Sequence, residues 1–379
     1  FGEGDVNFLV SAEWEHRSRL ETEERDFSSL PYAQNPVPWS TLTNLATYIP
    51  RTAGGTALGV LSDFTQSDCD AQGGVYSPGV PAYCRYNYAP FYNLVEEQDI
   101  FRGYAQINAR VNENMNFHAD AAYGQVKAPN QFASPSQPAL RGPAPTSGAT
   151  FQYTVPASNP FVQEFANRTG FSANPLSGFA NRYDIIVFRP FAHQGNPALG
   201  DGEGNSASSE IDYQVWRISA GIDGMLGDFG GPFQDVGYDF AVTYNSSQAY
   251  YQDPDYVGFR LQAALNGFGG PNCSVTDQDL LPPGIQAPGL AGTGGCQYFN
   301  PFSSSYAGNP ETGATNPNYV PGSENDPDLV RWLFDPLEIE TLTQSLTYDL
   351  VFNGTTGVDL PGGEIGWAVG AQGRQIEVR

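Results

Sequence analysis

Three kinds of residue in this chain have positions that could support chemistry: histidines, cysteines and clustered aromatic residues. The histidines, His16, His118 and His193, are far apart in the sequence. No Gly-x-Ser-x-Gly, His-Glu-x-x-His or phosphate-binding glycine loop accompanies them. We therefore expect no catalytic residues, no metal centre and no cofactor, and a protein that is not an enzyme.

The four cysteines form two pairs that are close in sequence, Cys69 with Cys84 and Cys273 with Cys296. Each pair lies in a stretch rich in Gly, Pro and Asp, a composition that favours loops. Four free thiols or a metal site are the alternatives, but the sequence has no Cys-x-x-Cys spacing and no histidine close to either pair. The pattern predicts two loop disulfides made in an oxidising compartment.

An aromatic run follows the first cysteine pair. Tyr86, Tyr88, Phe91 and Tyr92 could stack on a sugar ring or an aromatic chelate, so they are candidate ligand contacts. The alternative is a loop that packs on its own aromatic side chains.

The composition excludes one class of partner and favours one class of fold. The chain has 41 acidic and 17 basic residues, a formal net charge of -24, and Lys127 is its only lysine. Such a surface repels phosphate backbones, so we expect no nucleic-acid partner. The many Gly, Pro, Tyr and Phe residues favour turns and strands, and no apolar run is long enough for a transmembrane helix.

The elements that would position these residues are strands, because apolar and polar residues alternate with a period of two in seven segments. The segments are residues 6–15, 101–112, 117–123, 216–226, 238–245, 341–352 and 365–374. Long and short connections strictly take turns between them. We expect long loops at about 21–97, 129–209 and 253–338, and short turns at about 113–116, 228–235 and 354–362.

Alternating short and long connections are typical of outer-membrane barrels, which have short periplasmic turns and long outer loops. A soluble sandwich or propeller would place turns about every 8–12 residues throughout. The sequence thus predicts an all-β fold, an antiparallel transmembrane β-barrel in the bacterial outer membrane. Seven strands cannot close such a barrel, so we expect the chain to be part of a larger one that contacts lipid and lipopolysaccharide.

Charged residues on the polar side of the alternation are candidates for the inner wall, where they could guide a solute or dock a plug. The alternative is a wall that is only solvated or mutually paired. These candidate lumen-facing residues are Glu13, Arg102, Arg110, Asp120, Arg217, Asp223 and Asp239.

Four segments resemble parts of large TonB-dependent outer-membrane receptors. Two are the loop segments Ala264–Cys273 and Gly295–Phe302; the others, Phe8–Trp14 and Gly362–Gln372, are similar to barrel strands. The resemblance covers most of the chain in layout and a small part of it in motif. It implies a barrel of about 22 strands closed by an N-terminal plug, and import of a scarce nutrient such as a siderophore, vitamin or oligosaccharide with energy from the inner-membrane TonB complex.

Other functions remain open at this point. A passive porin or an adhesive barrel would use the same wall, and a secreted β-rich binding protein would dissolve without detergent. Neither the plug nor a TonB-contacting segment is expected within these residues. The sequence does not identify the small-molecule substrate.

Overall fold

The computed structural model describes residues 6–139, 141–143, 150–171, 181–196, 207–274, 289–310 and 312–379. Seven long strands form one antiparallel sheet in the order β1-β9-β10-β15-β16-β17-β18. Each contains one of the seven alternating segments, so the prediction of an antiparallel all-β fold is confirmed. Within the described residues the sheet is open, with β1 and β18 at its edges. The strand bounds are Val6–Arg17 (β1), Gln98–Asn112 (β9), Met115–Ala133 (β10), Ala207–Gly227 (β15), Gln234–Tyr256 (β16), Phe334–Leu360 (β17) and Gly363–Val378 (β18).

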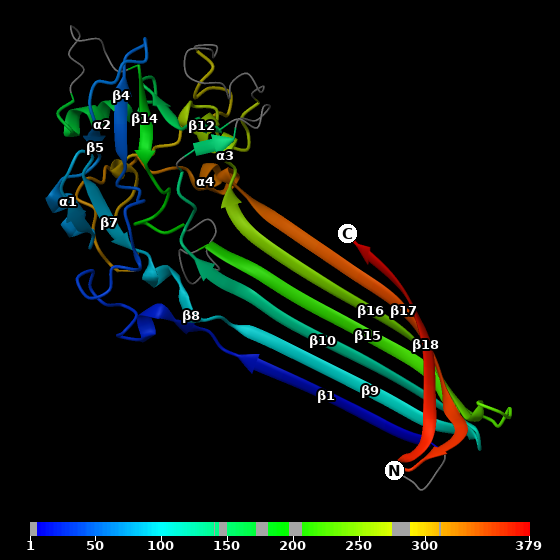
Figure 1. Ribbon diagram of the computed structural model, residues 1–379. Helices are drawn as coiled ribbons and strands as arrows, with labels where there is room; N and C mark the ends of the chain where they lie inside the picture. The colour runs from blue at the N-terminus through cyan, green and yellow to red at the C-terminus, as the bar shows by residue number, and fades with distance from the viewer. Residues whose placement is uncertain are drawn as a thin grey trace.

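Short turns join these strands at one end of the sheet (Figure 1). They are residues 113–114, 228–233 and 361–362. The last is shorter than the turn predicted at 354–362, because β17 continues to Leu360 and pairs there with Gly363. The register shifts between Thr355 and Asp359, and the β-branched residues in this stretch favour an extended backbone.

The long connections gather at the other end of the sheet (Figure 1). We call the described parts of residues 18–97, 134–206 and 257–333 the loop domain. The strands run further into the predicted loops than the alternation indicates; β10, for example, extends to Ala133 and β16 to Tyr256. The predicted loop residues 144–149, 172–180, 197–206 and 275–288 lie outside the described ones.

Short strands and helices build the loop domain. One sheet has the order β13-β14-β4-β5, another β3-β7-β6, and β2-β8 and β11-β12 are pairs. The strands are Leu20–Glu21 (β2), Trp39–Ser40 (β3), Thr47–Arg51 (β4), Leu61–Ser62 (β5), Val75–Ser77 (β6), Tyr83–Asn87 (β7), Asn93–Val95 (β8), Arg141–Pro143 (β11), Thr150–Gln152 (β12), Thr154–Pro156 (β13) and Arg182–Val187 (β14).

The helices are Gln66–Ala71 (α1), Val162–Arg168 (α2), Gly258–Leu265 (α3) and Pro327–Leu333 (α4), with 3-10 turns at Thr22–Glu24 (η1), Ala89–Phe91 (η2) and Ser303–Ser305 (η4). Local sequence explains two of their starts. Thr65 and Asp68 form a capping box at α1, and the Asp326 side chain caps α4 just before Pro327. None of the helices in the described residues has the length and apolar character needed to cross a bilayer.

All three connections share one apolar core. Tyr48 comes from the first, Phe165 from the second and Phe302 from the third, and all three side chains are fully buried. Phe165 and Phe302 stack with ring centroids 4.4 Å apart, and Tyr48 lies 5.1 Å from Phe165. Because each connection supplies one ring, the three fold as a single unit at the end of the sheet.

Candidate functional site

The register of the large sheet separates apolar from polar side chains over all seven strands. One row across the sheet contains only apolar residues and glycine: Phe8, Ile107, Ala119, Ala220, Val242, Tyr348 and Gly373. The next row on the same face is Val6, Ala109, Phe117, Ile222, Phe240, Leu350 and Ala371. We call this side the apolar face. Side chains on this face are exposed in the described structure; Phe8, for example, is 57% exposed.

Aromatic rings mark both ends of the apolar face. Towards the loop domain, the Tyr123 ring lies 5.8 Å from Phe101 and 4.5 Å from Trp216. Towards the turns, Phe233 lies 5.6 Å from Trp367. Beyond the first group the same face becomes polar in register, with Asp99, Lys127, Asp212 and Tyr250 on one row. The apolar face is therefore a band of limited height.

All seven predicted lumen-facing charges lie on the opposite, polar face. Two groups of them are paired: Arg102 Nη1 lies 3.2 Å from Glu13 Oε2, and Arg217 forms an ion pair with Asp120. The mutually paired wall, which the sequence left as an alternative, describes these four residues. Asp223 lies opposite Asp239 in register, and neither Arg110 nor Asp239 has an ion-pair partner within 4.0 Å among the described residues.

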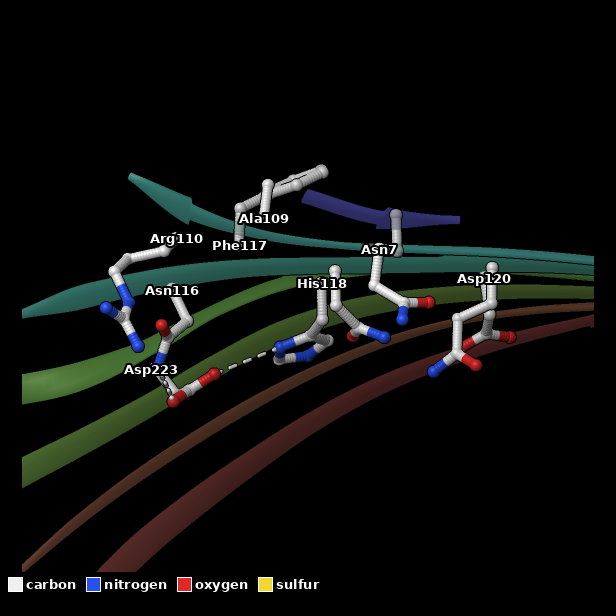
Figure 2. Close-up of a pocket in the computed structure, with 11 residues that line it drawn as sticks. Asn7, Ala109, Arg110, Asn116, Phe117, His118, Asp120 and Asp223 are labelled. Carbon is white, nitrogen blue, oxygen red and sulfur yellow. Dashed lines mark hydrogen bonds and ion pairs between the residues drawn. The ribbon is translucent and has the colours of Figure 1, made fainter. Parts of the chain in front are cut away.

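A first cavity of about 790 Å³ lies on the polar face close to the turns. Figure 2 shows Asn116, His118, Asp120 and Asp223 on one side of the sheet and Phe117 on the other. Asp223 accepts a hydrogen bond from Asn116 Nδ2 at 3.1 Å, and its other oxygen lies 3.3 Å from His118 Nδ1. The cavity is a polar depression with a carboxylate at its centre.

A second cavity of about 680 Å³ lies further towards the loop domain, and its chemistry differs. Ile100, Val126, Tyr213 and Val215 line it and adjoin one another across β9, β10 and β15. We call these four residues the inner apolar patch, because they share the face that carries the charges. Tyr213 and Val215 are each 50% exposed. Arg102 and Arg217 border the patch.

A third cavity of about 320 Å³ lies where the loop domain meets the same face of β15 and β16. Asp253, Asp255 and Tyr251 line it from β16, and Tyr92, Ser134 and Ser136 from the loop domain. Burial raises the pKa of the Asp255 carboxyl, and the nearby charge of Asp253 adds to the shift. No ion pair to either aspartate occurs in the described part of the chain.

The sequence matches no protein-family model and no curated protein. The functional assignment therefore rests on the residues and on this geometry.

A buried ion pair connects the three parts of the loop domain. The Asp63 carboxylate is inaccessible to solvent; it accepts from Arg168 Nη2 at 2.5 Å and from the backbone N–H of Ser303 at 2.5 Å. Arg168 Nε also donates to Glu164 at 2.8 Å. Burial raises the pKa of Asp63 to about 6, and the adjacent guanidinium limits the rise. This network adds a polar link to the shared aromatic core.

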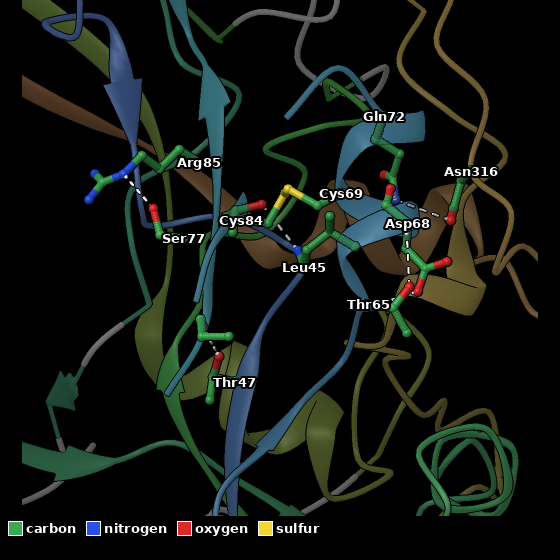
Figure 3. The surroundings of a disulfide bond; sticks show 12 residues. Leu45, Thr47, Thr65, Asp68, Cys69, Gln72, Ser77, Cys84, Arg85 and Asn316 are labelled. Carbon is green, nitrogen blue, oxygen red and sulfur yellow. Dashed lines mark hydrogen bonds between the residues drawn. A yellow bond between two sulfur atoms is a disulfide. The ribbon is translucent and has the colours of Figure 1, made fainter. Parts of the chain in front are cut away.

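Both predicted disulfides are present. Cys69 in α1 is bonded to Cys84 in β7 (Figure 3), and Cys273 is bonded to Cys296. A Cβ atom on Gly74 would lie 2.5 Å from the sulfur of Cys84, so the first disulfide packs directly on this glycine. Figure 3 also shows Gln72, just after α1, reaching the third connection, where its Nε2 donates to Asn316.

The aromatic run divides into two pairs. Tyr86 and Phe91 are buried against Ala192, so they cannot stack on a ligand, and the expectation of ligand contact is wrong for these two. The reason is that the loop packs on its own aromatic side chains. The same burial raises the pKa of the Tyr86 hydroxyl to about 12. Tyr88 and Tyr92 are half-buried, with ring centroids 5.5 Å apart. Tyr92 alone of the four lines the third cavity.

The sequence reasoning missed the inner apolar patch, although a signal for it exists. On β15 the apolar residues occupy even positions from Trp216 towards the turn, but odd positions at Ile211, Tyr213 and Val215. The alternation therefore changes phase at Trp216. A similar change on β10 leaves Gln125 on the apolar face and Val126 on the polar one.

Another group that the sequence did not single out is His16 with Glu97 and Asp99. Its potential ligand atoms lie within 4.8 Å of one another, and His16 Nδ1 lies 2.9 Å from Asp99 Oδ1. This group lies at the loop end of β1 and β9, and His16 is exposed.

Proposed function

We propose that the seven-stranded sheet is part of the wall of a bacterial outer-membrane β-barrel that imports a scarce nutrient as a TonB-dependent receptor. The observation that supports this most directly is the apolar band in register across the sheet, bounded by aromatic rings at both ends. A tilted strand crosses a bilayer with about 9–11 residues, and barrels carry aromatic girdles at both interfaces. The stretch from Trp216 to Leu226 has this length. Outer-membrane lipid and lipopolysaccharide would cover the band.

The open edges of the sheet agree with a wall that continues. Unpaired backbone N–H and C=O groups in hydrocarbon are costly, so β1 and β18 each need a further strand in a membrane. In the proposal, those strands and a plug inside the barrel come from residues outside the given sequence. Contact with the inner-membrane TonB complex would be made through that plug.

The loop domain favours a receptor over a passive porin. Three connections that share a core and a buried ion pair and that contain two disulfides would form a defined surface above the lumen. Disulfides also fit a surface exposed to an oxidising compartment. A passive conduit has no need for such an ordered assembly.

The two loop segments behind the family resemblance contact each other. Gly269 and Gln297 exchange backbone hydrogen bonds of 2.9 and 2.8 Å. Phe299 and Phe302 then continue into the shared core. The resemblance therefore concerns a structural unit of the loop domain, which supports the proposal.

Cysteine labelling of the full-length protein in intact outer membranes tests the wall. Asn7 and Phe8 are adjacent, exposed and on opposite faces of β1. We expect Asn7→Cys to react with a water-soluble maleimide, and Phe8→Cys to react only with a bilayer-soluble one. Equal reaction of both variants with the water-soluble reagent would refute the membrane wall.

Growth tests then separate a receptor from a passive pore. Strains that lack either this gene or TonB are compared on single limiting sources of iron, cobalamin and oligosaccharide. A receptor predicts the same nutrient defect in both strains. A defect confined to the strain without this gene indicates a passive or adhesive barrel.

A further inference from the structure

The second and third cavities follow each other along one face of β15 and β16. On β15, Tyr213 lines the second cavity and Ser209 the third, four residues further on and on the same face. At the usual rise, this separation is about 13 Å. On β16, Ser247 and Tyr251 repeat the arrangement. The two cavities thus follow each other along the inner side of the sheet, and we call this stretch, with the loop domain at one end, the groove.

One half of this groove is suited to an apolar group. The inner apolar patch places three aliphatic side chains and the Tyr213 ring side by side. Exposed apolar surface of this kind is favourable only when something covers it. The arginines beside it are neutralised, because Arg102 pairs with Glu13 and Arg217 with Asp120. The patch therefore does not attract an anion.

The other half is suited to a cation. Asp253 and Asp255 both face the third cavity, and neither has a basic partner among the described residues. Asp253 accepts a hydrogen bond from Ser209 at 3.0 Å, which orients it and leaves its charge uncompensated. In the described residues, one group of three side chains has potential metal-ligand atoms within 4.8 Å of one another. It consists of His16, Glu97 and Asp99, which lie outside this cavity. Among the described residues, Asp253 and Asp255 belong to no such group of three ligand side chains, so the two carboxylates suit an organic ammonium group better than a metal ion.

We propose that this groove binds a small amphipathic organic cation, with its apolar body on the inner apolar patch and its ammonium group between Asp253 and Asp255. The proposal rests on the proposed function, since it names the class of solute that the barrel would take from the loop domain into the lumen. The two cavity volumes, about 680 and 320 Å³, fall in the range of small-molecule sites. The acidic chain, with a net charge of -24, attracts cations from a distance.

The probe for the test is dansylcadaverine, an apolar fluorophore with a primary ammonium tail. Dansyl-6-aminohexanoate carries a carboxylate on a similar tail and is the matched anion. Both are titrated against the full-length protein in lipid nanodiscs, and empty nanodiscs give the background. We expect saturable, blue-shifted emission with the cation only. Equal affinity for the anion, or no saturation with either probe, would overturn the proposal.

Four variants locate the site. We expect Asp253→Asn with Asp255→Asn to raise the Kd for dansylcadaverine at least about tenfold, and Val215→Asp to remove the blue shift. Asp253→Glu should restore most of the affinity, which separates loss of charge from misfolding. Asp349→Asn, on the same face but outside both cavities, should leave the Kd unchanged. An unchanged Kd in the double variant would refute the site. The labelling of Asn7→Cys and Phe8→Cys reports on the membrane wall independently, so the two proposals can fail separately.

Discussion

Replacing Arg168 by Met removes the cation that lies between Asp63 and Glu164 and keeps most of the side chain's length. Arg168 is 20% exposed and Asp63 is not exposed at all. Removing one partner of a buried ion pair costs about 3–5 kcal/mol, because the other charge stays buried without compensation. Because Arg168 is partly exposed, we expect the loss in the free energy of unfolding to lie near the lower end of this range, at about 3 kcal/mol.

The pH dependence of this loss follows from the pKa of Asp63. With Arg168 present, the folded-state pKa is about 6, above the ordinary value of 3.8. The folded state therefore binds the proton more tightly than the unfolded state, and the contribution of Asp63 to stability grows as the pH falls from about 6 towards 3.8. Without the guanidinium the folded-state pKa rises further. We expect Arg168→Met to be more damaging at pH 8 than at pH 5, where the carboxyl is neutral.

Hydrogen exchange of the full-length protein measures the loss of loop-domain stability at each pH, after correction for the intrinsic pH dependence of exchange. Peptides from β4 and α2 report on the loop domain, and peptides from β16 serve as an internal reference. Arg331→Met is the matched control, since Arg331 is 62% exposed and pairs with Asp328 in the same helix; it should cost less than about 1 kcal/mol. Unchanged protection of the loop domain at pH 8, or a larger loss at pH 5, would refute the reasoning.

Three further variants test other parts of the structure. Val242→Arg, on the apolar face, should destabilise the membrane-embedded protein by about 2–4 kcal/mol, whereas its neighbour Thr243→Arg, on the polar face, should cost little; heat-modifiable migration on gels compares them. Gly74→Ala should hinder formation of the Cys69–Cys84 disulfide, because its Cβ would overlap both sulfur atoms; thiol labelling under non-reducing conditions detects the cysteines left unpaired. Burial lowers the pKa of His193 from 6.5 to about 3, so its contribution to stability is lost as the pH falls below 6.5, by about 2 kcal/mol at pH 5. His193→Phe should flatten that part of the stability profile measured by hydrogen exchange.

The sheet was predictable because its determinants are local. A strand between two different surroundings must alternate, so residues such as Phe240 and Val242 define a face before any partner strand is known. The cysteine pairs were predictable for a similar reason, since each pair is close in sequence and lies in turn-rich chain. The shared face of the seven charged residues follows from the same alternation, because their parity alone places them on the polar face.

The loop domain was not predictable, because its determinants are not local. Tyr48, Phe165 and Phe302 meet from three connections, and no periodicity in any one of them indicates the other two. Judged from the sequence alone, Asp63 cannot be told apart from an exposed loop aspartate, because only the tertiary fold brings Arg168 and Ser303 into contact with it. Tyr86 illustrates the converse, since an aromatic residue in a polar loop reads equally well as a ligand contact or as a core residue until its neighbours are known.

The change of phase at Trp216 connects the wall to the proposed ligand groove. In the proposed barrel, lipid would surround the outer side of β15 from Trp216 towards the turns, where that side is apolar. From Trp216 towards the loop domain that side would meet water, and it is polar at Gln214 and Asp212. Solvent alone would make the inner side polar there as well, yet Tyr213 and Val215 are apolar. In the proposed barrel, either a bound solute or a further segment inside the barrel would cover them. Asp253 and Asp255 distinguish these two occupants. If a solute binds in the groove, the two aspartates should make binding selective for the cationic probe. If a segment of the same protein covers the patch, no such selectivity is expected.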